Sequence, residues 1–284
     1  MKLYIIDAFT DTLFGGNPAG VVMCDNTRPS DNFMLALAAE LGYSETAFVF
    51  PQKGGDSFQI RYFTPVCEVD LCGHATIAAF CALGYEGRVK DGNSYLTMTK
   101  AAELNIDIGS ECVWMDMAAP ISIGVMLDED LLPLYAAFGL DLSAMPPSLT
   151  PELISTGLPD IIMPVNDTAL FDMRPNFDTI SSISKKYGVT GVHAFALNDD
   201  CTARCRNFAP LYGIDEEAAT GTSNGALTYY LYKRDLIKLN RTNRFIQGES
   251  MGRPSLILSR LETIDGGFVV RIGGSGVILC KGDI

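Results

Sequence analysis

Glu45 has the chemistry and the surroundings that are needed to move a proton. It stands at the mouth of an apolar strand that we predict over 46–50, next to the hydroxyl side chains of Tyr43 and Ser44. A carboxylate partly removed from water there could serve as a general acid and base. The alternative is a solvated glutamate at the end of a strand.

His74 follows a glycine at the start of a second apolar segment, in Cys72-Gly73-His74-Ala75-Thr76. The stretch from Leu71 to Leu83 is apolar on nearly every side, which is typical of a buried helix. A helix N-terminus beneath the ring should keep the imidazole neutral, with one nitrogen to donate and the other to accept. The alternative is a histidine hydrogen-bonded within the core, which is how we interpret His193.

Three carboxylates and a glycine turn lie in the stretch 215–224, at the start of another helical segment. The stretch could be an acidic loop that only caps the helix. Alternatively, Glu217, Gly221 and Thr222 line a cleft between two domains, opposite the first two candidates, where ligand sites are common. The backbone N–H groups at both helix starts could hold an anion such as a substrate carboxylate.

Cys72 could act as a thiolate base or nucleophile, because a helix N-terminus favours the thiolate. A racemase with two thiols needs a matching cysteine in the other half of the chain, and Thr220 occupies that position. This mismatch argues against such a mechanism. A Cys-His nucleophilic pair would have to use His74 or His193, the two histidines of the sequence.

Patterns that hold a nucleotide or a metal are missing from the sequence. It contains neither G-x-x-x-x-G-K-[ST] nor a strand-linked G-x-G-x-x-G. Cys201 and Cys205 have three residues between them, but with two histidines in the chain we interpret them as structural thiols, not as zinc ligands. We therefore expect proton transfer that uses no cofactor and no metal.

The composition argues against several classes of protein. There are 21 Lys and Arg against 34 Asp and Glu, a net charge of −13, and the longest basic cluster is a pair. Neither nucleic acid nor an anionic membrane is therefore an expected partner. The near-chargeless stretch Leu71–Tyr85 is about 15 residues long, short of the roughly 20 that span a bilayer. Eight sparse cysteines favour reduced thiols and a cytoplasmic location.

Short runs rich in Val, Ile and Phe, bounded by Gly, Pro and Asp, predict strands that alternate with two or three helices. Ser30 is a plausible N-cap for a helix over Asp31–Leu41 that stops at Gly42, and a buried helix is expected over Thr222–Tyr232. The expected strands are Leu3–Ala8, Ala19–Met23, Thr46–Phe50, Gln59–Phe63, Leu104–Ile108, Val113–Met117, Ile161–Val165, Ala194–Leu197, Ser255–Leu258, Phe268–Ile272 and Val277–Cys280.

The sequence also repeats itself at about half its length. Four short matches occur in the same order, 141, 147, 145 and 148 positions apart. They are Gly16-Asn17-Pro18 with Gly157-Leu158-Pro159, Thr46–Val49 with His193–Ala196, Arg61–Pro65 with Arg206–Pro210, and Gly73 with Gly221. We predict two homologous halves, each a barrel-like α+β unit that buries a helix, with coincidence as the alternative. The offset of 147 makes Val192 the counterpart of Glu45, so one half has a carboxylate that the other lacks.

Several motifs together resemble the PhzF-like family of phenazine-biosynthesis isomerases, which is related to diaminopimelate epimerase. They are Asp7-Ala8-Phe9, Phe14–Val22, Ser44–Phe48, Arg61–Pro65 and Cys72–Thr76. The resemblance covers essentially the whole chain and implies an α+β fold of two pseudo-symmetric domains, each a barrel-like, mostly antiparallel sheet around a central helix. It implies domains at 1–118 and 119–272, with a C-terminal strand at 273–284 that returns to the first domain, and a homodimer.

The resemblance also implies roles for single residues. The family's catalytic glutamate falls on Glu45 and its active-site histidine on His74. The family pattern Glu-Asp-Pro-Ala-Thr-Gly-Ser is here Glu216–Thr222, so its aspartate falls on Glu217 and its serine on Thr222. The longer carboxylate and the extra methyl group alter the cleft, so a different substrate is expected. Substrate binding is implied at Gly73, Ala75, Gly221 and Thr222.

Residues and resemblance together predict a soluble, cytoplasmic isomerase with a biosynthetic role, which moves a proton on a small carboxylic acid without a cofactor. Glu45 would abstract and redeliver the proton, while His74 and Glu217 position polar groups of the substrate. Two alternatives stay open. One is an amino-acid racemase or epimerase that uses Cys72, and the other is a protein that binds a small carboxylic acid without catalysis.

Overall fold

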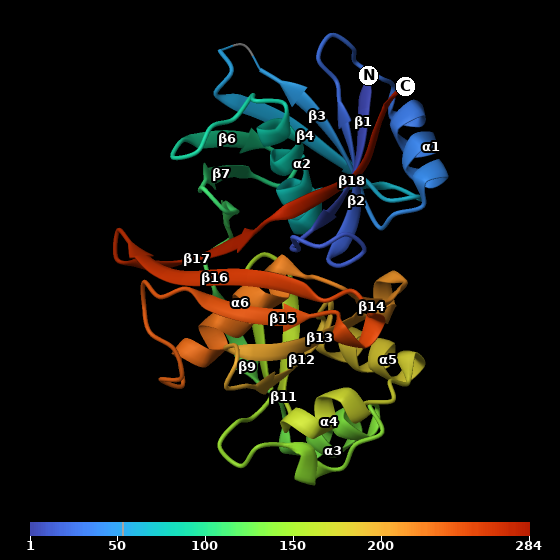
Figure 1. Cartoon of the computed structure of the whole chain (residues 1–284). Coiled ribbons are helices and arrows are strands. Elements are labelled where there is room, and N and C mark those ends of the chain that lie inside the picture. Colours follow the sequence, from blue (N-terminus) through green and yellow to red (C-terminus); the bar gives the residue numbers. More distant parts are fainter. Residues whose placement is uncertain (53) are drawn as a thin grey trace. The chain divides into compact units, whose positions relative to one another are not determined.

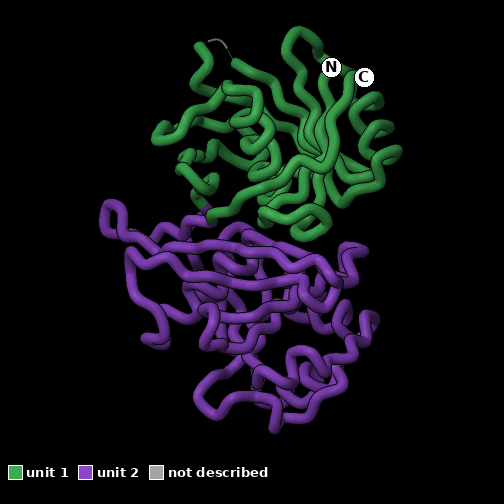
Figure 2. The backbone as a smooth tube through the Cα atoms, in the orientation of Figure 1, with its two compact units in different colours: residues 1–116, 273–284 green, residues 117–272 purple. Residues whose placement is uncertain are grey.

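The computed structural model describes residues 1–52 and 54–284 (Figure 1). Its backbone forms two compact units: unit 1 comprises residues 1–116 and 273–284, and unit 2 comprises residues 117–272 (Figure 2). Among the helices of the described residues, none is both long enough and apolar enough to cross a bilayer.

Unit 1 is a curved sheet that surrounds helix α2 (Gly73–Tyr85) (Figure 1). This helix contacts β1, β2, β3, β8 and β18, and most of its side chains are buried, as its apolar sequence predicts. The other elements of unit 1 are β1 (Lys2–Ala8), β2 (Asn17–Met23), α1 (Asp31–Leu41), β3 (Thr46–Pro51), β4 (Ser57–Phe63), β5 (Glu68–Val69), β6 (Ser94–Met98), β7 (Glu103–Ile108), β8 (Val113–Asp116) and β18 (Gly276–Asp283).

In unit 2 the strands pack around helix α6 (Gly221–Tyr232), which contacts β10, β11, β12 and β16. Helices α4 and α5 pack on β12 and β13 from the other side, over an apolar core. The remaining elements are β9 (Ile121–Val125), α3 (Asp128–Ala136), η1 (Leu142–Ala144), β10 (Glu152–Ser155), β11 (Pro159–Pro164), α4 (Asp167–Asp172), α5 (Phe177–Tyr187), β12 (Gly191–Leu197), β13 (Ala203–Ala209), η2 (Pro210–Tyr212), β14 (Ile214–Glu217), β15 (Asn243–Gln247), η3 (Glu249–Met251), β16 (Ser255–Ile264) and β17 (Gly267–Gly274).

The strands of the two units pair in the same order. In unit 1 the order is β18–β1–β2–β3–β4–β6–β7, with β5 also paired to β4, and only β2–β3 and β4–β6 are parallel. In unit 2 the order is β9–β10–β11–β12–β13–β15–β16, with β14 also paired to β13, and only β11–β12 and β13–β15 are parallel. Each of these strands of unit 1 therefore has a defined counterpart in unit 2.

The register of these strands corrects one inference from the sequence. Thr46 on β3 and Val192 on β12 pair with equivalent phenylalanines of the next strand, so they are counterparts at an offset of 146, not 147. The counterpart of Glu45 is therefore Gly191, and the assignment of Val192 to that place was wrong. A Cβ at Gly191 would lie 2.0 Å from the backbone oxygen of Phe208, so a side chain does not fit there.

The predicted helices and strands are all present, with small differences at their ends. Helix α1 begins after Ser30, whose hydroxyl accepts a hydrogen bond from the Phe33 N–H, and it ends at Gly42 in the left-handed conformation, with φ 69°. These are the cap signals that the sequence displays. The strands and α-helices that the sequence did not reveal are β5, β6, β9, β10, β13, β14, β15, α3, α4 and α5.

Candidate active site

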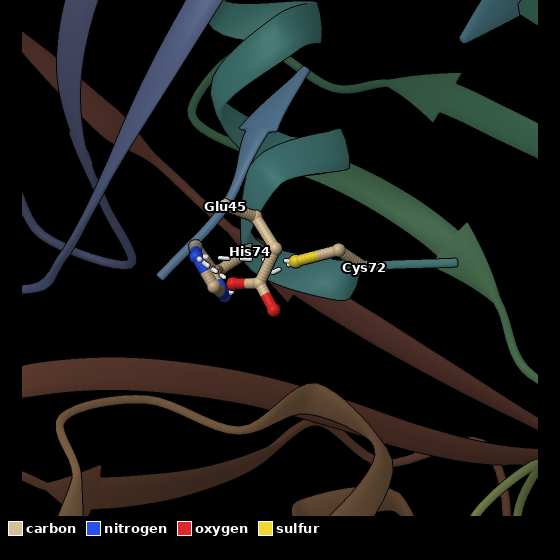
Figure 3. Close-up of side chains that lie close together, drawn as sticks. All are labelled: Glu45, Cys72 and His74. Carbon is tan, nitrogen blue, oxygen red and sulfur yellow. Dashed lines mark hydrogen bonds and ion pairs between the residues drawn. The ribbon is translucent and has the colours of Figure 1, made fainter. Parts of the chain in front are cut away.

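Glu45 lies between α1 and β3, where the chain turns into the sheet. Its backbone carbonyl accepts a hydrogen bond of 3.3 Å from the Gly20 N–H on β2, which fixes the backbone at this point. Its side chain is 14% exposed, and the Oε2 atom lies 3.3 Å from His74 Nε2. The carboxylate is therefore mostly removed from water and held against the imidazole (Figure 3).

His74 is the second residue of α2, and its side chain is 4% exposed. Ser44 Oγ lies 3.3 Å from Nε2, and Cys72 Sγ lies 3.4 Å from Nδ1. Burial lowers the pKa of the ring, and the negative charge of Glu45 opposes this effect as the smaller cause. The ring is therefore neutral near pH 7, as expected, although burial is the main reason, rather than the helix terminus.

Two buried hydroxyls hold the start of α2 in place. Thr76 Oγ1 donates to the Cys72 carbonyl at 2.7 Å and lies 2.7 Å from the Tyr62 hydroxyl. The helix begins at Gly73, and Ala75 is completely buried. The first N–H groups of a helix have no carbonyl partner within it, so a turn held in this way can present them to an anion.

In unit 2, Glu217 is the last residue of β14, three residues before the N-cap of α6. Thr220 Oγ1 donates to Glu217 Oε2 at 2.9 Å. Thr222, in the first turn of α6, has its backbone carbonyl bonded by the Thr156 hydroxyl at 2.8 Å. A Cβ at Gly221 would meet only Ile272 Cγ2, at the ordinary contact distance of 3.5 Å. There is therefore open space beside the backbone in the first turn of α6.

The structure thus gathers Glu45, His74 and Cys72 in unit 1, and Glu217, Gly221 and Thr222 at the α6 start of unit 2. Three polar neighbours were not among the predicted site residues. Ser44 contacts the imidazole, while Thr220 and Gln247 bond to Glu217. His193 is completely buried and lies 3.3 Å from Asn207 Nδ2, which agrees with the structural role that we gave it.

The cluster of Glu45, Cys72 and His74 is the one group among the described residues whose ligand atoms lie within 4.8 Å of one another, as a metal site requires. The two partners, however, meet different nitrogens of the ring. Cys72 Sγ is nearer to Nδ1, at 3.4 Å, than to Nε2, at 3.9 Å, whereas Glu45 approaches Nε2. In a tetrahedral zinc site every ligand atom points at one ion bound to a single ring nitrogen, so the nearer approach of Cys72 to the other nitrogen does not favour metal binding.

The order of strands and the buried central helices define an α+β fold of the epimerase type. A hydroxyproline epimerase from Agrobacterium vitis superposes with a TM-score of 0.65 at 13% identity, covering 99% of this chain and 91% of that one, which is a likeness of fold alone. A PhzF-family phenazine biosynthesis protein from Bacillus anthracis superposes with a TM-score of 0.90 at 27% identity, covering 100% and 98%. The expected fold class is confirmed.

Residues 6–282 match the family model of phenazine biosynthesis-like proteins. An uncharacterized isomerase from Clostridium acetobutylicum is 32% identical over 305 residues, covering 100% of this chain and 97% of that protein. The trans-2,3-dihydro-3-hydroxyanthranilate isomerase of Pseudomonas chlororaphis is 33% identical over 293 residues, covering 99% and 98%. The chain belongs to the phenazine biosynthesis-like (PhzF) family and is an isomerase of small molecules.

Proposed function

We propose that this isomerase moves a proton on a small carboxylic acid without a cofactor, with Glu45 as the general acid and base. The observation that carries the proposal is the contact of Glu45 Oε2 with the neutral ring of His74, at 3.3 Å, in a site that is mostly buried. A carboxylate mostly shielded from water can take a proton from one carbon and deliver a proton to another, with solvent exchanging the proton on the carboxylate only slowly.

The other residues hold the substrate in this proposal. His74, neutral and bonded on both nitrogens, orients a polar group of the substrate, and Glu217 does the same from unit 2. The N–H groups at Gly73, Ala75, Gly221 and Thr222 bind the substrate carboxylate. Such local donors are needed because a protein with a net charge of −13 does not attract an anion over a distance. In this proposal the two helix starts act on one substrate.

The relative from Pseudomonas chlororaphis suggests a probe, since its name gives trans-2,3-dihydro-3-hydroxyanthranilate as the substrate. This compound is a small, unsaturated amino acid with one carboxylate. We propose related unsaturated carboxylic acids as the substrate class, because Glu217 and Thr222 depart from the family pattern. The homodimer and the cytoplasmic location stay predictions.

The test is Glu45→Gln with proton exchange as the readout. In deuterated water the wild-type enzyme should place deuterium in the isomerised probe, and Glu45→Gln should slow this by at least about 10²-fold, the range of general acid–base catalysis. Calorimetric binding of the probe should stay within a few-fold. Glu40→Gln on the exposed side of α1 is the matched control. Unchanged exchange in Glu45→Gln would sink the assignment.

One contact favours the alternative in which Cys72 carries the chemistry, since its thiol lies 3.4 Å from His74 Nδ1. In that case Cys72→Ser should lose racemisation of an amino acid, and a thiol-alkylating reagent should inhibit the wild type. Our proposal expects Cys72→Ser to keep most of the exchange activity. The two variants, Glu45→Gln and Cys72→Ser, therefore give opposite outcomes under the two functions.

A further inference from the structure

Unit 2 buries a set of polar side chains that begins at Asp160 on β11. Ser223 Oγ donates to Asp160 Oδ2 at 2.5 Å, and Asn207 Nδ2 donates to Ser223 Oγ at 3.0 Å. The same amide group lies 3.3 Å from His193 Nδ1. All four residues are 3% exposed or less, so none of these bonds competes with bulk water.

The set continues from His193 toward the start of α6. Since Nδ1 faces the Asn207 amide, the ring proton belongs on Nε2, which interacts with the side chain of Asn224. This is the loosest link, because neither His193 Nε2 nor Asn224 Oδ1 has a hydrogen bond of regular geometry within the described chain. Asn224 Nδ2 then donates to Gln247 Oε1 at 2.8 Å.

Gln247 joins this set to Glu217. Its Nε2 donates to the Glu217 carbonyl at 2.7 Å and to Thr220 Oγ1 at 3.1 Å, while its Oε1 accepts from the Thr220 N–H at 3.3 Å. Thr220 Oγ1 in turn donates to Glu217 Oε2 at 2.9 Å. Each hydrogen has one acceptor, and the Asn207 amide donates in two directions: through Ser223 the bonds end at the Asp160 carboxylate, and through His193, Asn224 and Gln247 they end at the Glu217 carboxylate. We call the residues from Asp160 to Glu217 the α6 network.

The fold does not require the α6 network, as the counterparts in unit 1 show. The strand ladders and the helix starts place Ala19, Ala47, Tyr62 and Ala75 where unit 2 has Asp160, His193, Asn207 and Ser223. In unit 1 the Tyr62 ring fills this space and its hydroxyl lies 2.7 Å from Thr76. Burying an acid and an imidazole costs free energy that three alanines and a tyrosine do not cost, so a functional reason is expected.

We propose that the α6 network positions the Glu217 carboxylate and the first turn of α6 for the reaction, with Gln247 as the positioning residue. This inference rests on the proposed function, in which Glu217 orients the substrate. Gln247 is suited to the role because it is completely buried and bonds on both sides of the N-cap. Loss of the Gln247 side chain would remove a hydrogen bond to the Thr220 hydroxyl. Because this hydroxyl donates to the Glu217 carboxylate, the carboxylate would be held less firmly.

The kinetic test compares variants that break the α6 network with variants of equal burial that do not. Gln247→Leu should lower the exchange rate at saturating probe by about 10²-fold, because small misplacements of positioning groups have effects of this size. Thr220→Val removes the hydroxyl that donates to Glu217 Oε2 and should lower the exchange rate about tenfold, whereas Thr220→Ser should restore it. Gln247→Leu with the rate of the wild type would overturn the proposal.

Ser259→Ala is the matched control, since the Ser259 hydroxyl is equally buried and bonds to Thr228, further along the same helix, at 2.6 Å. It should lose stability but keep the exchange rate within about twofold of the wild type, because it leaves the Glu217 bonds intact. A loss of rate as large as that of Gln247→Leu would mean that any weakening of α6 has the same effect, and it would refute a positioning role.

A second measurement needs no substrate and separates this inference from the proposed function. With 13C-labelled glutamate, the carboxyl resonance of Glu217, assigned through Glu217→Gln, should move in Gln247→Leu and Thr220→Val but not in Ser259→Ala. If the wild type shows no exchange while these shifts occur, the proposed function fails and the positioning of Glu217 stands. If Glu217 keeps its resonance in every variant, the inference fails, whatever the activity.

Discussion

Acid should destabilise unit 2 through His193, because this ring is buried in its neutral form. The residue is 0% exposed, and burial lowers its pKa from 6.5 to about 3, with the Asn224 hydrogen bond as a smaller opposing effect. The unfolded chain therefore binds a proton between these two values more readily than the folded protein does. The stability that His193 contributes is fully present above about pH 6.5 and is lost as the pH falls toward about 3.

The size of the effect follows from the width of that window. Each pH unit within it is worth about 1.4 kcal/mol, so acidification from about pH 6.5 to about pH 4.5 removes about 3 kcal/mol. Asp160 acts in the opposite direction, because burial raises the pKa of its carboxyl from 3.8 to about 6. The folded protein takes up this proton first and gains about 2 kcal/mol over the same range. The net change in the wild type is therefore small and conceals both contributions.

His193→Gln separates the two effects, since the glutamine amide can accept from Asn207 and donate to Asn224 but does not titrate in this range. The free energy of opening would be measured by hydrogen exchange of β11 and β12 peptides at both pH values. On acidification, the variant should become more stable relative to the wild type by about 3 kcal/mol. Parallel pH dependence of the two proteins would show that His193 is not buried as a neutral ring.

Two further predictions concern a buried glycine and a mostly buried ion pair in unit 2. Gly191→Ala should prevent folding or lower stability by more than about 3 kcal/mol, because its Cβ would lie 2.0 Å from Phe208 O, whereas Gly221→Ala should fold, since its Cβ would meet only Ile272 at 3.5 Å. Thermal unfolding measures both, and equal melting temperatures would contradict the register. Glu216→Gln should cost about 3–5 kcal/mol in urea, because it leaves Arg206, which is 8% exposed, without its charge partner. A loss below about 1 kcal/mol would mean that the ion pair behaves as an exposed one.

Local patterns predicted most of the core elements but not the polar strands. β13 reads Ala-Arg-Cys-Arg-Asn-Phe-Ala and is buried because Arg206 pairs with Glu216, and β10 begins with Glu152, which pairs with Lys233 and Arg234. A strand whose charges are neutralised by partners elsewhere in the chain has no apolar run to reveal it. Helix α5 is different, because Asn176 and Gly188 cap it and two lysines lie in its last turn, so the sequence does display the signals at its two ends.

Some residues of the candidate site could likewise be predicted from the sequence, and others could not. The sequence could suggest Glu45, His74 and Cys72, because their side chains are reactive and each stands beside an apolar segment. Gln247 could not be found, because it stands at the end of an unremarkable strand and acts on Glu217, which lies 30 residues before it. Its contacts exist only when β15 and the α6 start have come together.

The corrected register strengthens the case for a single proton-transferring residue. A mechanism with two equivalent bases would use counterpart positions of the two units, but the counterpart of Glu45 is Gly191, where the Phe208 carbonyl leaves no room for a side chain. Glu217 is not the missing base, since its own counterpart on β5 is Val69, as the pairing of each strand with its neighbour shows. The two carboxylates arose at unrelated positions, so different tasks are expected of them. Glu45, held against a neutral imidazole, is suited to move the proton, and Glu217, fixed by the α6 network, is suited to orient the substrate.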